Sequence, residues 1–328
     1  MRITTKKPFL ILLLVLSLFV FVQASLLVHF VDVGQGDAVL IQTPNQKNIL
    51  IDGGPRTAGD YLVQYLKEQG VATIDVLIAT HPHEDHIGGL INVIDNFPIK
   101  EAYYPNKAHT TVTFERFITG INNSKAKRVR AIKGREISVD PDISLVILSP
   151  SDRDYKDLNH YSVVTKLVYK NTSFLFTGDA EDINEEEMLA AKLDLQADVL
   201  KVGHHGSTTS SMPKFLDAVS PKIAVIMVGN DNKFSHPHKE ILDRLLQRDV
   251  DILRTDELGD IVLFSDGDQL FLVSNTDYEA NSFVEFVYIT ETGKKFHRDG
   301  CRFLTTKQKI TKDKALDLGY EACGVCKP

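Results

Sequence analysis

The sequence is poor in cysteine, and the few cysteines it has lie in one place. All three fall in the last 28 residues, at Cys301, Cys323 and Cys326, and an odd, clustered set argues against the disulfide framework of many exported proteins. None lies near residues 22–25, which argues against a lipoprotein. The chain also lacks low-complexity stretches and a repeat at a fixed period, so a solenoid or propeller is not expected.

Long apolar runs are also scarce. Only the N-terminal run approaches the length that spans a bilayer. It covers Phe9–Val22 without a charge, follows the basic residues Arg2, Lys6 and Lys7, and ends at small residues of the kind that a signal peptidase reads. Residues 1–25 are therefore predicted to be a signal peptide, and the protein to be secreted or extracellular. The alternative is an N-terminal membrane anchor that stays uncleaved.

Charge is spread unevenly along the chain. The net charge is −7, with +3 in residues 1–25 and +3 in residues 285–328, which leaves −13 for residues 26–284. An acidic body is a poor generic binder of polyanions. The basic tail is the better candidate for contact with DNA or the cell wall, although a charge run is usually just a solvated face.

Short apolar strands alternate with helical segments in the body of the chain. A meander of strands followed by a helix occurs in the first half and again in the second, which predicts two sheets packed face to face with helices outside. The fold class is thus α/β (α+β). The predicted strands are 26–33, 38–43, 48–52, 76–80, 144–148, 162–169, 174–177, 199–202, 223–228, 252–253, 261–264 and 270–273, and the predicted helices are 60–69 and 184–192.

The strongest chemical signal follows the predicted strand 76–80. His81, His83, Asp85 and His86 place four metal-capable side chains within six residues, and a loop at a strand end can fold such residues around two ions. Imidazole and carboxylate ligands suit zinc, manganese or iron. His81 and His83 are predicted to serve one ion, and Asp85 and His86 the other. The alternative is a polar loop that happens to be rich in histidine.

Two later strand ends carry further candidate ligands. Asp179 follows a glycine at the end of the predicted strand 174–177. Alone, such a pair is usually a turn, but after the histidine cluster Asp179 is a candidate to bridge two ions. His204 and His205 end the predicted strand 199–202. One of them could complete the second ion, and the other could act as a general acid or hold a substrate phosphate.

Residues beyond these histidines are candidates for substrate contact. Ser207 and Thr208 lie in a stretch that precedes a predicted helix, so its backbone N–H groups could bind an anion. His236 follows a fourth apolar run and could add a site residue. His238 is predicted to start a helix and to face solvent.

Three aspartates are candidates for a supporting role. Asp32 and Asp37 flank a turn between the first two strands, where glycines permit positive φ. Either could face the metals, although a hairpin turn explains most of the motif. Asp52 precedes two glycines and could accept a hydrogen bond from a ligand histidine, which would fix the tautomer of that ring.

Together these motifs resemble the metallo-β-lactamase superfamily, and more narrowly the ComEC-like extracellular hydrolase domains. The resemblance covers about residues 26–275. It implies a four-layer αββα sandwich with a dinuclear site at one edge, and hydrolysis, often of phosphoesters, by a metal-activated hydroxide. The stretches that carry it are Phe30–Ala38, Leu50–Gly54, Thr80–Gly89, Phe176–Asp179 and Leu200–Ser207.

One departure from the superfamily pattern concerns the first ion. Many members carry a third histidine between the cluster and the bridging aspartate, but only His109 and His160 lie in that interval here. ComEC-like chains tend to place asparagine at this point, and Asn159 is next to His160. His160 is therefore a candidate ligand of a first site without a secure third histidine.

The tail, residues 285–328 after a linker over 276–284, suggests a second metal site. His297, Cys301, Cys323 and Cys326 give His-x3-Cys and Cys-x2-Cys spacings, and three thiolates with one imidazole make a closed tetrahedral zinc site. Such a site would fold a module too small for a good core of its own. The tail resembles the metal-binding domain of the Ada DNA-repair protein, with histidine in place of one cysteine. The alternative is a loose tail with stray cysteines.

The resulting hypothesis is an exported, monomeric hydrolase with two divalent ions, zinc or manganese, and one structural zinc. Extracellular DNA is the first choice of substrate, and a small or cell-wall phosphoester, such as a phosphocholine ester, is the close competitor. A lactam or lactone is third, and a DNA- or wall-binding protein without turnover is the alternative of another class. The predicted ligands are His81, His83, Asp85, His86, Asp179 and one of His204 and His205, with Asp85, Asp179 and His205 as catalytic residues.

Overall fold

A computed structural model of the protein describes residues 25–230, 232–273, 286–290, 293–298, 301–304 and 308–327. The predicted signal peptide, apart from Ser25, and the predicted linker lie outside these ranges. Within them, no helix has the length and apolar character needed to cross a membrane.

The first sheet combines the strands of the N-terminal half with two strands from the end of the body. Across the sheet the order is β14 (Leu270–Val273), β13 (Ile261–Ser265), β1 (Leu26–Phe30), β2 (Val39–Gln42), β3 (Asn48–Ile51), β4 (Ile74–Ile78), β5 (Ile99–Tyr104) and β6 (Lys127–Arg130). Pairing is antiparallel from β14 to β3 and parallel from β3 to β6. The antiparallel part corresponds to the predicted meander.

The second sheet repeats this plan with the later strands. Its order is β12 (Asp251–Arg254), β11 (Ile223–Ile226), β10 (Val199–Lys201), β9 (Thr172–Phe176), β8 (Val164–Tyr169) and β7 (Ile143–Ser149). Pairing is antiparallel from β7 to β9 and parallel from β9 to β12. Each sheet therefore joins a hairpin region to a parallel region.

An apolar core fills the space between the two sheets. Successive residues of a strand point to opposite faces, so each central strand contributes to this core and to an outer one. In β3, Ile49 and Ile51 join the inner core, whereas Leu50 faces outward. The rings of Phe30 and Phe176, from opposite sheets, have centroids 6.2 Å apart. The sheets thus pack face to face.

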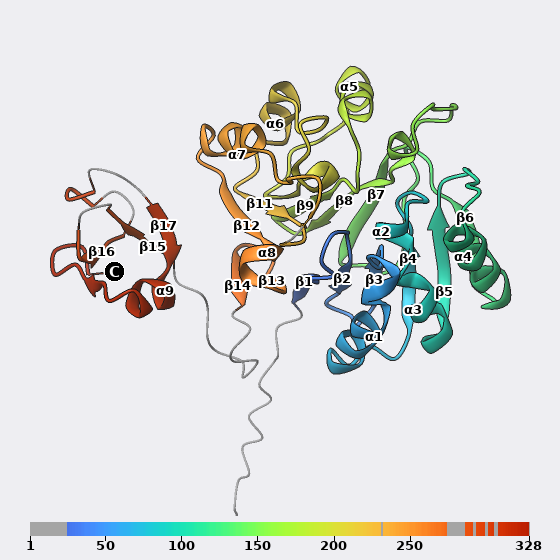
Figure 1. The fold of residues 1–328 in the computed structure, drawn as a ribbon, viewed down its shortest axis with the longest axis horizontal. Coiled ribbons are helices and arrows are strands. Elements are labelled where there is room, and N and C mark those ends of the chain that lie inside the picture. Colours follow the sequence, from blue (N-terminus) through green and yellow to red (C-terminus); the bar gives the residue numbers. More distant parts are fainter. Residues whose placement is uncertain are drawn as a thin grey trace, which may run out of the picture.

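Helices cover the outer face of each sheet. They are α1 (Gly59–Glu68), α3 (Leu90–Asn96) and α4 (Val112–Asn123) on the first sheet, and α5 (Asp182–Ala190), α6 (Pro213–Val219) and α7 (Lys239–Leu246) on the second. Figure 1 shows the two groups of helices on opposite sides of the paired sheets. This arrangement is the predicted four-layer αββα sandwich. A short helix, α8 (Thr255–Leu258), follows β12.

The predicted strands are confirmed, with ends that differ by a few residues. The first strand stops at Phe30, because Gly34 and Gly36 turn the chain with φ values of 74° and 146°. The predicted helices 60–69 and 184–192 correspond to α1 and α5. No element is predicted over residues 90–130, where the structure has α3, β5, α4 and β6.

The described part of the tail contains small sheets and a short helix. The strand β15 (Phe286–Ile289) pairs with β17 (Gln308–Thr311), β16 (Lys295–Phe296) pairs with β18 (Glu321–Ala322), and α9 spans Lys312–Asp317. A core of this size gives little stabilisation by itself. Its buried members are Val287, Ile289, Phe296, Ile310 and Ala315.

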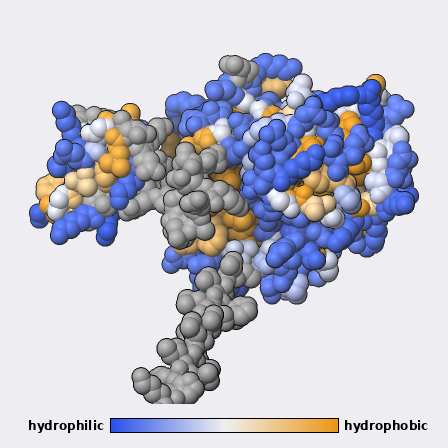
Figure 2. All heavy atoms as spheres, turned by 90° about the horizontal axis from the view of Figure 1, so that it is seen from below, coloured by the Kyte–Doolittle hydropathy of each residue, from blue (hydrophilic) through white to orange (hydrophobic). Residues whose placement is uncertain are grey.

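The surface of the described body is mainly polar. Figure 2 shows a hydrophilic face on which apolar side chains appear in separate patches. Singly exposed apolar residues are normal on soluble proteins. Two phenylalanine residues have nearly the same exposed fraction. Phe234 in the body is 50% exposed, and Phe303 in the tail is 49% exposed.

Candidate metal centres

The candidate ligands meet at one edge of the sandwich because the strands that carry them end there. In the first sheet β1, β3 and β4 run in one direction, and in the second β9, β10 and β11 are parallel. Ligands commonly bind in the crevice beyond the carboxyl ends of such strands. The loops after these strands bring together the histidines and aspartates that the sequence predicts, and α2 (Glu84–Ile87) begins within the histidine motif.

Asp85, His86, Asp179 and His205 form a group whose ligand atoms lie within 4.8 Å of one another. Nε2 of His86 is 3.2 Å from one oxygen of Asp179, and Nε2 of His205 is 3.4 Å from the other. Nε2 of His205 is also 3.6 Å from Asp85. Both Nε2 atoms and Oδ1 of Asp179 are buried and have no hydrogen-bond partner among the described residues. A divalent cation would satisfy all three atoms, so the residues fit a metal ion.

The other ring nitrogen of each ligand histidine is occupied, which fixes the tautomer. Nδ1 of His86 lies 2.8 Å from Asp52, whose carboxylate also accepts hydrogen bonds from the backbone N–H (2.7 Å) and hydroxyl (2.6 Å) of Thr80. Nδ1 of His205 donates to the Met227 carbonyl at 2.9 Å. Both Nε2 atoms are therefore available to a cation. The supporting role predicted for Asp52 agrees with this geometry.

Two opposing effects set the protonation of these rings: burial disfavours the charged form, and nearby carboxylates favour it. Burial disfavours the charged imidazole, but Asp179 and Asp52 outweigh it and raise the pKa of His86 well above the ordinary value. Asp179, with Asp37 and Asp85, raises the pKa of His205 in the same way. Protons and a divalent ion therefore compete for the same Nε2 atoms.

We expect the metal affinity of this group to fall as the pH is lowered. Because the pKa values of His86 and His205 are raised, an incoming ion must displace a proton from each ring. Affinity should therefore rise with pH, by up to about tenfold per pH unit for each proton displaced. Calorimetric titration with manganese at about pH 6 and about pH 8 measures this change. An affinity that is constant across this interval would contradict the expected competition.

His81, His83 and Asp179 form a further group that shares Asp179 with the first. Nε2 of His81 lies 2.9 Å from Nδ1 of His83 and 3.8 Å from Asp179. Burial and the neighbouring His86 lower the pKa of His81 well below the ordinary value, which keeps the ring neutral as a ligand. Asp179 belongs to both groups, which is compatible with the bridging role predicted from the sequence, and that role stays a prediction.

Neither histidine between the cluster and Asp179 joins this group. Nε2 of His160 is 3.0 Å from Glu181, and the ring of His109 is 6.4 Å from that of His83. The structure therefore pairs His160 with a carboxylate rather than with the ligands, which corrects its candidacy. Asn159 is buried, and its Oδ1 has no hydrogen-bond partner in the part of the chain that the structure describes.

His204 and His205 are adjacent, but only one enters a metal-capable group. Both lie in η3 (Gly203–Gly206) with positive φ values of 46° and 53°, an uncommon conformation for residues other than glycine. His205 joins Asp179, whereas Nδ1 of His204 lies 3.0 Å from Glu181 and its Nε2 lies 3.9 Å from Asp179. The ligand position thus goes to His205. His204 faces the site from outside the ligand groups, held by Glu181, a residue without a sequence signal.

Lys201 is a second residue that the sequence does not single out. It is 1% exposed, forms an ion pair with Asp37, and donates to the Gly178 carbonyl at 2.9 Å. Burial works to raise the pKa of Asp37, but Lys201 and His205 outweigh it and lower that pKa. An oxygen of Asp37 lies 3.4 Å from Nδ1 of His205. The predicted supporting role of Asp37 is thus matched by a contact to a ligand ring.

Asp32, the other aspartate of the glycine turn, belongs to no metal-capable group of the described residues. Its side chain accepts a hydrogen bond from the N–H of Gly34 at 3.1 Å, and its own N–H donates to Asp260 at 2.7 Å. Asp32 therefore closes the turn, as the hairpin alternative predicts, and does not face the metals.

The stretch after the histidine pair offers no free row of N–H groups. The N–H of Thr208 donates to Nδ1 of His238 at 3.1 Å, and the other N–H groups of Ser207–Ser210 donate within the same turn. The helix α6 begins only at Pro213. The structure therefore gives no support to anion binding by these N–H groups, and substrate contact by the side chains of Ser207 and Thr208 stays a prediction. His238 is the residue that precedes α7, as expected, but it is half-buried and accepts the hydrogen bond from Thr208 instead of facing solvent.

His236 lies beside the ligand group. The centroid of its ring is 6.4 Å from that of His205 and 5.5 Å from that of His204. Burial, together with His204, His205 and His238, lowers the pKa of His236 to about 4, so the ring is neutral at neutral pH. Its predicted role in substrate binding is compatible with this position and stays a prediction.

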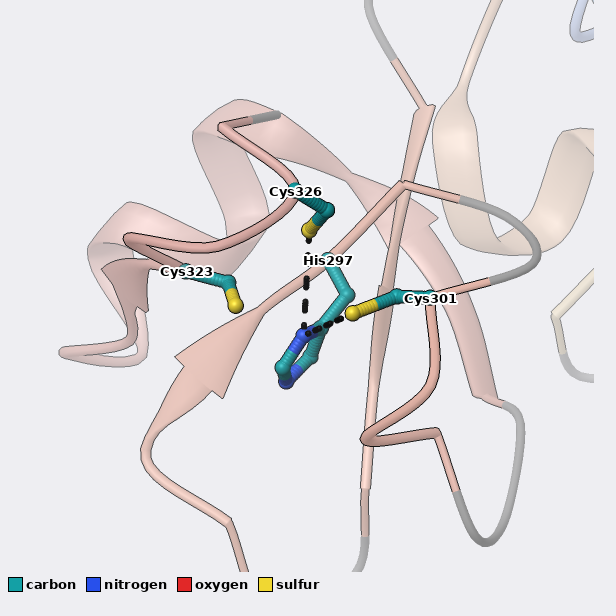
Figure 3. A group of neighbouring side chains, drawn as sticks. All are labelled: His297, Cys301, Cys323 and Cys326. Carbon is teal, nitrogen blue, oxygen red and sulfur yellow. Dashed lines mark hydrogen bonds between the residues drawn. The ribbon is translucent and has the colours of Figure 1, made fainter.

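In the tail, His297, Cys301, Cys323 and Cys326 form a group whose ligand atoms lie within 4.8 Å of one another. Nδ1 of His297 is 3.3 Å from Sγ of Cys301 and 3.9 Å from Sγ of Cys326. Figure 3 shows the three sulfur atoms and the ring nitrogen gathered around one space. All three cysteines are free, in agreement with the absence of a disulfide framework. Three thiols and one imidazole fit a structural zinc ion.

Replacing Cys323 and Cys326 together by serine is expected to remove one zinc ion per chain and to unfold the tail. Structural zinc contributes about 10–16 kcal/mol to the folding of comparable small modules, whereas the apolar core of this tail is small. Metal analysis and limited proteolysis of the full chain measure both effects. Unchanged zinc content in the variant would contradict the assignment, and the metal content of the body should be unaffected.

Comparison with known proteins agrees with this geometry. The family model described as the metallo-beta-lactamase superfamily matches residues 31–229. The chain is 30% identical over 251 residues to ComE operon protein 3 of Bacillus subtilis, which covers 71% of this chain and 32% of that protein. It is 32% identical over 230 residues to competence protein ComA of Neisseria gonorrhoeae, covering 70% of this chain and 30% of that protein.

The chain thus spans about a third of the length of the curated relatives it matches. Among solved structures, the CmlA β-hydroxylase E377D mutant aligns with a TM-score of 0.50 at 14% identity, covering 73% of this chain and 53% of that one. At this identity the likeness shows a shared fold alone.

Proposed function

The chain belongs to the metallo-β-lactamase superfamily, and we propose that it is a metal-dependent phosphodiesterase that cleaves DNA outside the cell. The observation that carries the proposal is the pair of ligand groups that share Asp179. In one of them Nε2 of His86, Nε2 of His205 and Oδ1 of Asp179 are buried without hydrogen-bond partners among the described residues. Two cations that shared this carboxylate would suit in-line displacement at phosphorus.

The part that each residue would take in the hydrolysis follows from its position in the site. When bound, the two ions supply a nucleophilic water at neutral pH and neutralise charge on the phosphate. Asp52 and the Met227 carbonyl hold two ligand rings through Nδ1, which would leave each Nε2 free to bind an ion. His204, oriented by Glu181, faces the site and is placed to contact a phosphate oxygen or to give a proton to the leaving group. The ligands are His81, His83 and Asp179 for one ion, and Asp85, His86, Asp179 and His205 for the other.

DNA is supported as the substrate by the relatives and by the tail. Among the relatives, ComA of Neisseria gonorrhoeae is named a competence protein, and a relative from Haemophilus influenzae is named recombination protein 2. The tail carries a net charge of +3 in residues 285–328, which would favour contact with a polyanion. Export of the chain, which DNA outside the cell would require, is proposed from the signal-peptide pattern of residues 1–25.

The charge of the body favours a second candidate function. Residues 26–284 carry −13 when the ends of the chain are set aside, and a long polyanion would be repelled by this surface at low salt. A small phosphoester, for example a phosphocholine ester of the cell wall, would meet less repulsion. The same ligand groups would serve either substrate.

One experiment separates these functions. The full chain, loaded with manganese or zinc, is incubated with labelled DNA, with a phosphocholine ester and with a chromogenic phosphodiester, over a range of salt. Metal-dependent cleavage of DNA supports the first proposal, and cleavage of the small esters alone supports the second. Salt-sensitive DNA binding without cleavage of any substrate would favour a binding protein instead.

A further inference from the structure

An exposed aromatic ring stands at the end of a short row of rings that leads from the metal centre. The ring of His236 is tilted by 29° from that of His205, with centroids 6.4 Å apart. The ring of Phe234 is tilted by 24° from that of His236, with centroids 5.6 Å apart. Phe234 is 50% exposed. The row therefore runs from a ligand histidine to solvent with nearly parallel planes.

Hydrogen bonds hold the segment that carries this row. The side-chain N–H groups of Asn232 donate to the carbonyls of Gly229 (2.8 Å) and His236 (2.7 Å), and its oxygen accepts from the N–H of His236 (2.9 Å). The segment lies between β11 and α7, beyond the carboxyl end of a strand. The turn thus places the ring of Phe234 beside that of His236, which in turn lies beside the ring of His205.

A cation accompanies the exposed ring. Nζ of Lys233 lies 5.1 Å from the ring centroid of Phe234, and Lys233 is itself exposed. Bases of single-stranded nucleic acid stack on aromatic side chains while nearby cations follow the phosphates. Ring, backing imidazole and cation therefore provide the elements that a nucleotide beside the metal centre would contact.

We propose that Phe234, backed by His236, is a stacking site for the nucleobase next to the scissile phosphodiester, with Lys233 pairing with a flanking phosphate. This subsite rests on the proposed phosphodiesterase function and narrows its substrate. A base can stack there only when it has left its own stack, so the enzyme prefers single strands or strand ends to the interior of a duplex.

Dinucleotides test the stacking site without a contribution from long-range charge. The substrates are thymidylyl-thymidine and two analogues in which the base on one side of the phosphate is missing. The wild-type full chain with manganese should lose about 5- to 150-fold in kcat/KM when the stacked base is removed. It should lose little when the other base is removed. Equal kcat/KM for all three substrates would overturn the proposal.

Variants of Phe234 link that preference to the ring. Phe234→Leu should abolish the discrimination against the abasic substrate, and Phe234→Tyr should keep it. Phe303→Leu is a matched control, because Phe303 is 49% exposed and has the guanidinium of Arg302 5.0 Å from its ring. An equal loss on all three substrates in Phe234→Leu would indicate a structural effect and overturn the proposal.

A binding measurement keeps this test independent of turnover. Fluorescence anisotropy compares a labelled thymidine oligomer with an abasic oligomer of the same length and charge. Weaker binding of the abasic oligomer in the wild type, with the difference lost in Phe234→Leu, supports the stacking site even where no dinucleotide is cleaved. Absence of cleavage would then count against the phosphodiesterase, whereas equal binding of both oligomers would count against the stacking site.

Discussion

Joint replacement of Asp85 by asparagine and His86 by glutamine is expected to lower metal-dependent turnover by about a thousandfold or more. These two side chains supply half of the four-residue ligand group. A glutamine side chain does not reproduce the imidazole Nε2 of His86, which lies 3.2 Å from Asp179. It also removes Nδ1 of His86, which is the partner of Asp52. Steady-state kinetics on the phosphodiester that the wild type cleaves best, together with the number of ions per chain, measures the effect.

The same chemical changes can be made away from the ligands as a control. Asp95 is exposed on α3, and His109 lies outside the metal-capable groups of the described residues. The double variant Asp95→Asn/His109→Gln should therefore keep both turnover and metal content. Undiminished turnover in the Asp85 and His86 variant would sink the assignment of hydrolysis to this centre.

Replacing Lys201 by methionine is expected to lower the free energy of unfolding by about 3–5 kcal/mol. Lys201 and Asp37 are 1% and 2% exposed, so the substitution leaves a buried carboxylate without its cation. It also removes the hydrogen bond to the Gly178 carbonyl, next to Asp179. Urea denaturation of the wild type and the variant at neutral pH measures the difference.

This loss should depend on pH with a defined sign. In the wild type the pKa of Asp37 is lowered, so its stabilising contribution is present above the unfolded-state pKa and is lost as the pH falls through the folded-state pKa. Without Lys201, burial is opposed only by His205 and His86, so the pKa of Asp37 is higher than in the wild type, and protonation relieves the uncompensated charge. The gap in stability between wild type and variant should therefore narrow toward about pH 4.

Two further variants isolate the buried pair. Combining Lys201→Met with Asp37→Asn removes the unpaired charge and should recover part of the lost stability. Lys222→Met breaks an exposed pair, in which Lys222 is 78% exposed and 2.8 Å from Asp198, and should cost less than about 1 kcal/mol. If the free energy of unfolding falls no more in Lys201→Met than in Lys222→Met, the buried pair stabilises the fold no more than an exposed pair does.

The sequence predicts those parts of the centre whose signal is local. His81, His83, Asp85 and His86 lie within six residues, and Asp179 ends a strand, so spacing and strand ends were enough to assign them. The strands of both sheets are likewise visible as short apolar runs. Burial on both faces makes these runs continuous, as in Ile49–Ile51.

Other features depend on contacts between distant residues and have no local signal. His204 and His205 are adjacent and both left-handed, and only the folded chain shows that His205 enters the ligand group. Glu181 and Lys201 become part of the site through His204 and Asp37, which are 23 and 164 positions away along the chain. The strand β6 was missed because it lies at a sheet edge, where Lys127–Arg130 has mainly exposed polar side chains.

The ligand groups draw on both sheets of the sandwich. The histidine motif follows β4 in the first sheet, whereas Asp179 and His205 follow β9 and β10 in the second. Cations bound between these loops would link two halves of the chain that are far apart in the sequence. An ion that binds only the folded state stabilises that state by an amount that grows with the logarithm of the free ion concentration. The supply of metal would therefore set the stability of the protein as well as its rate of turnover.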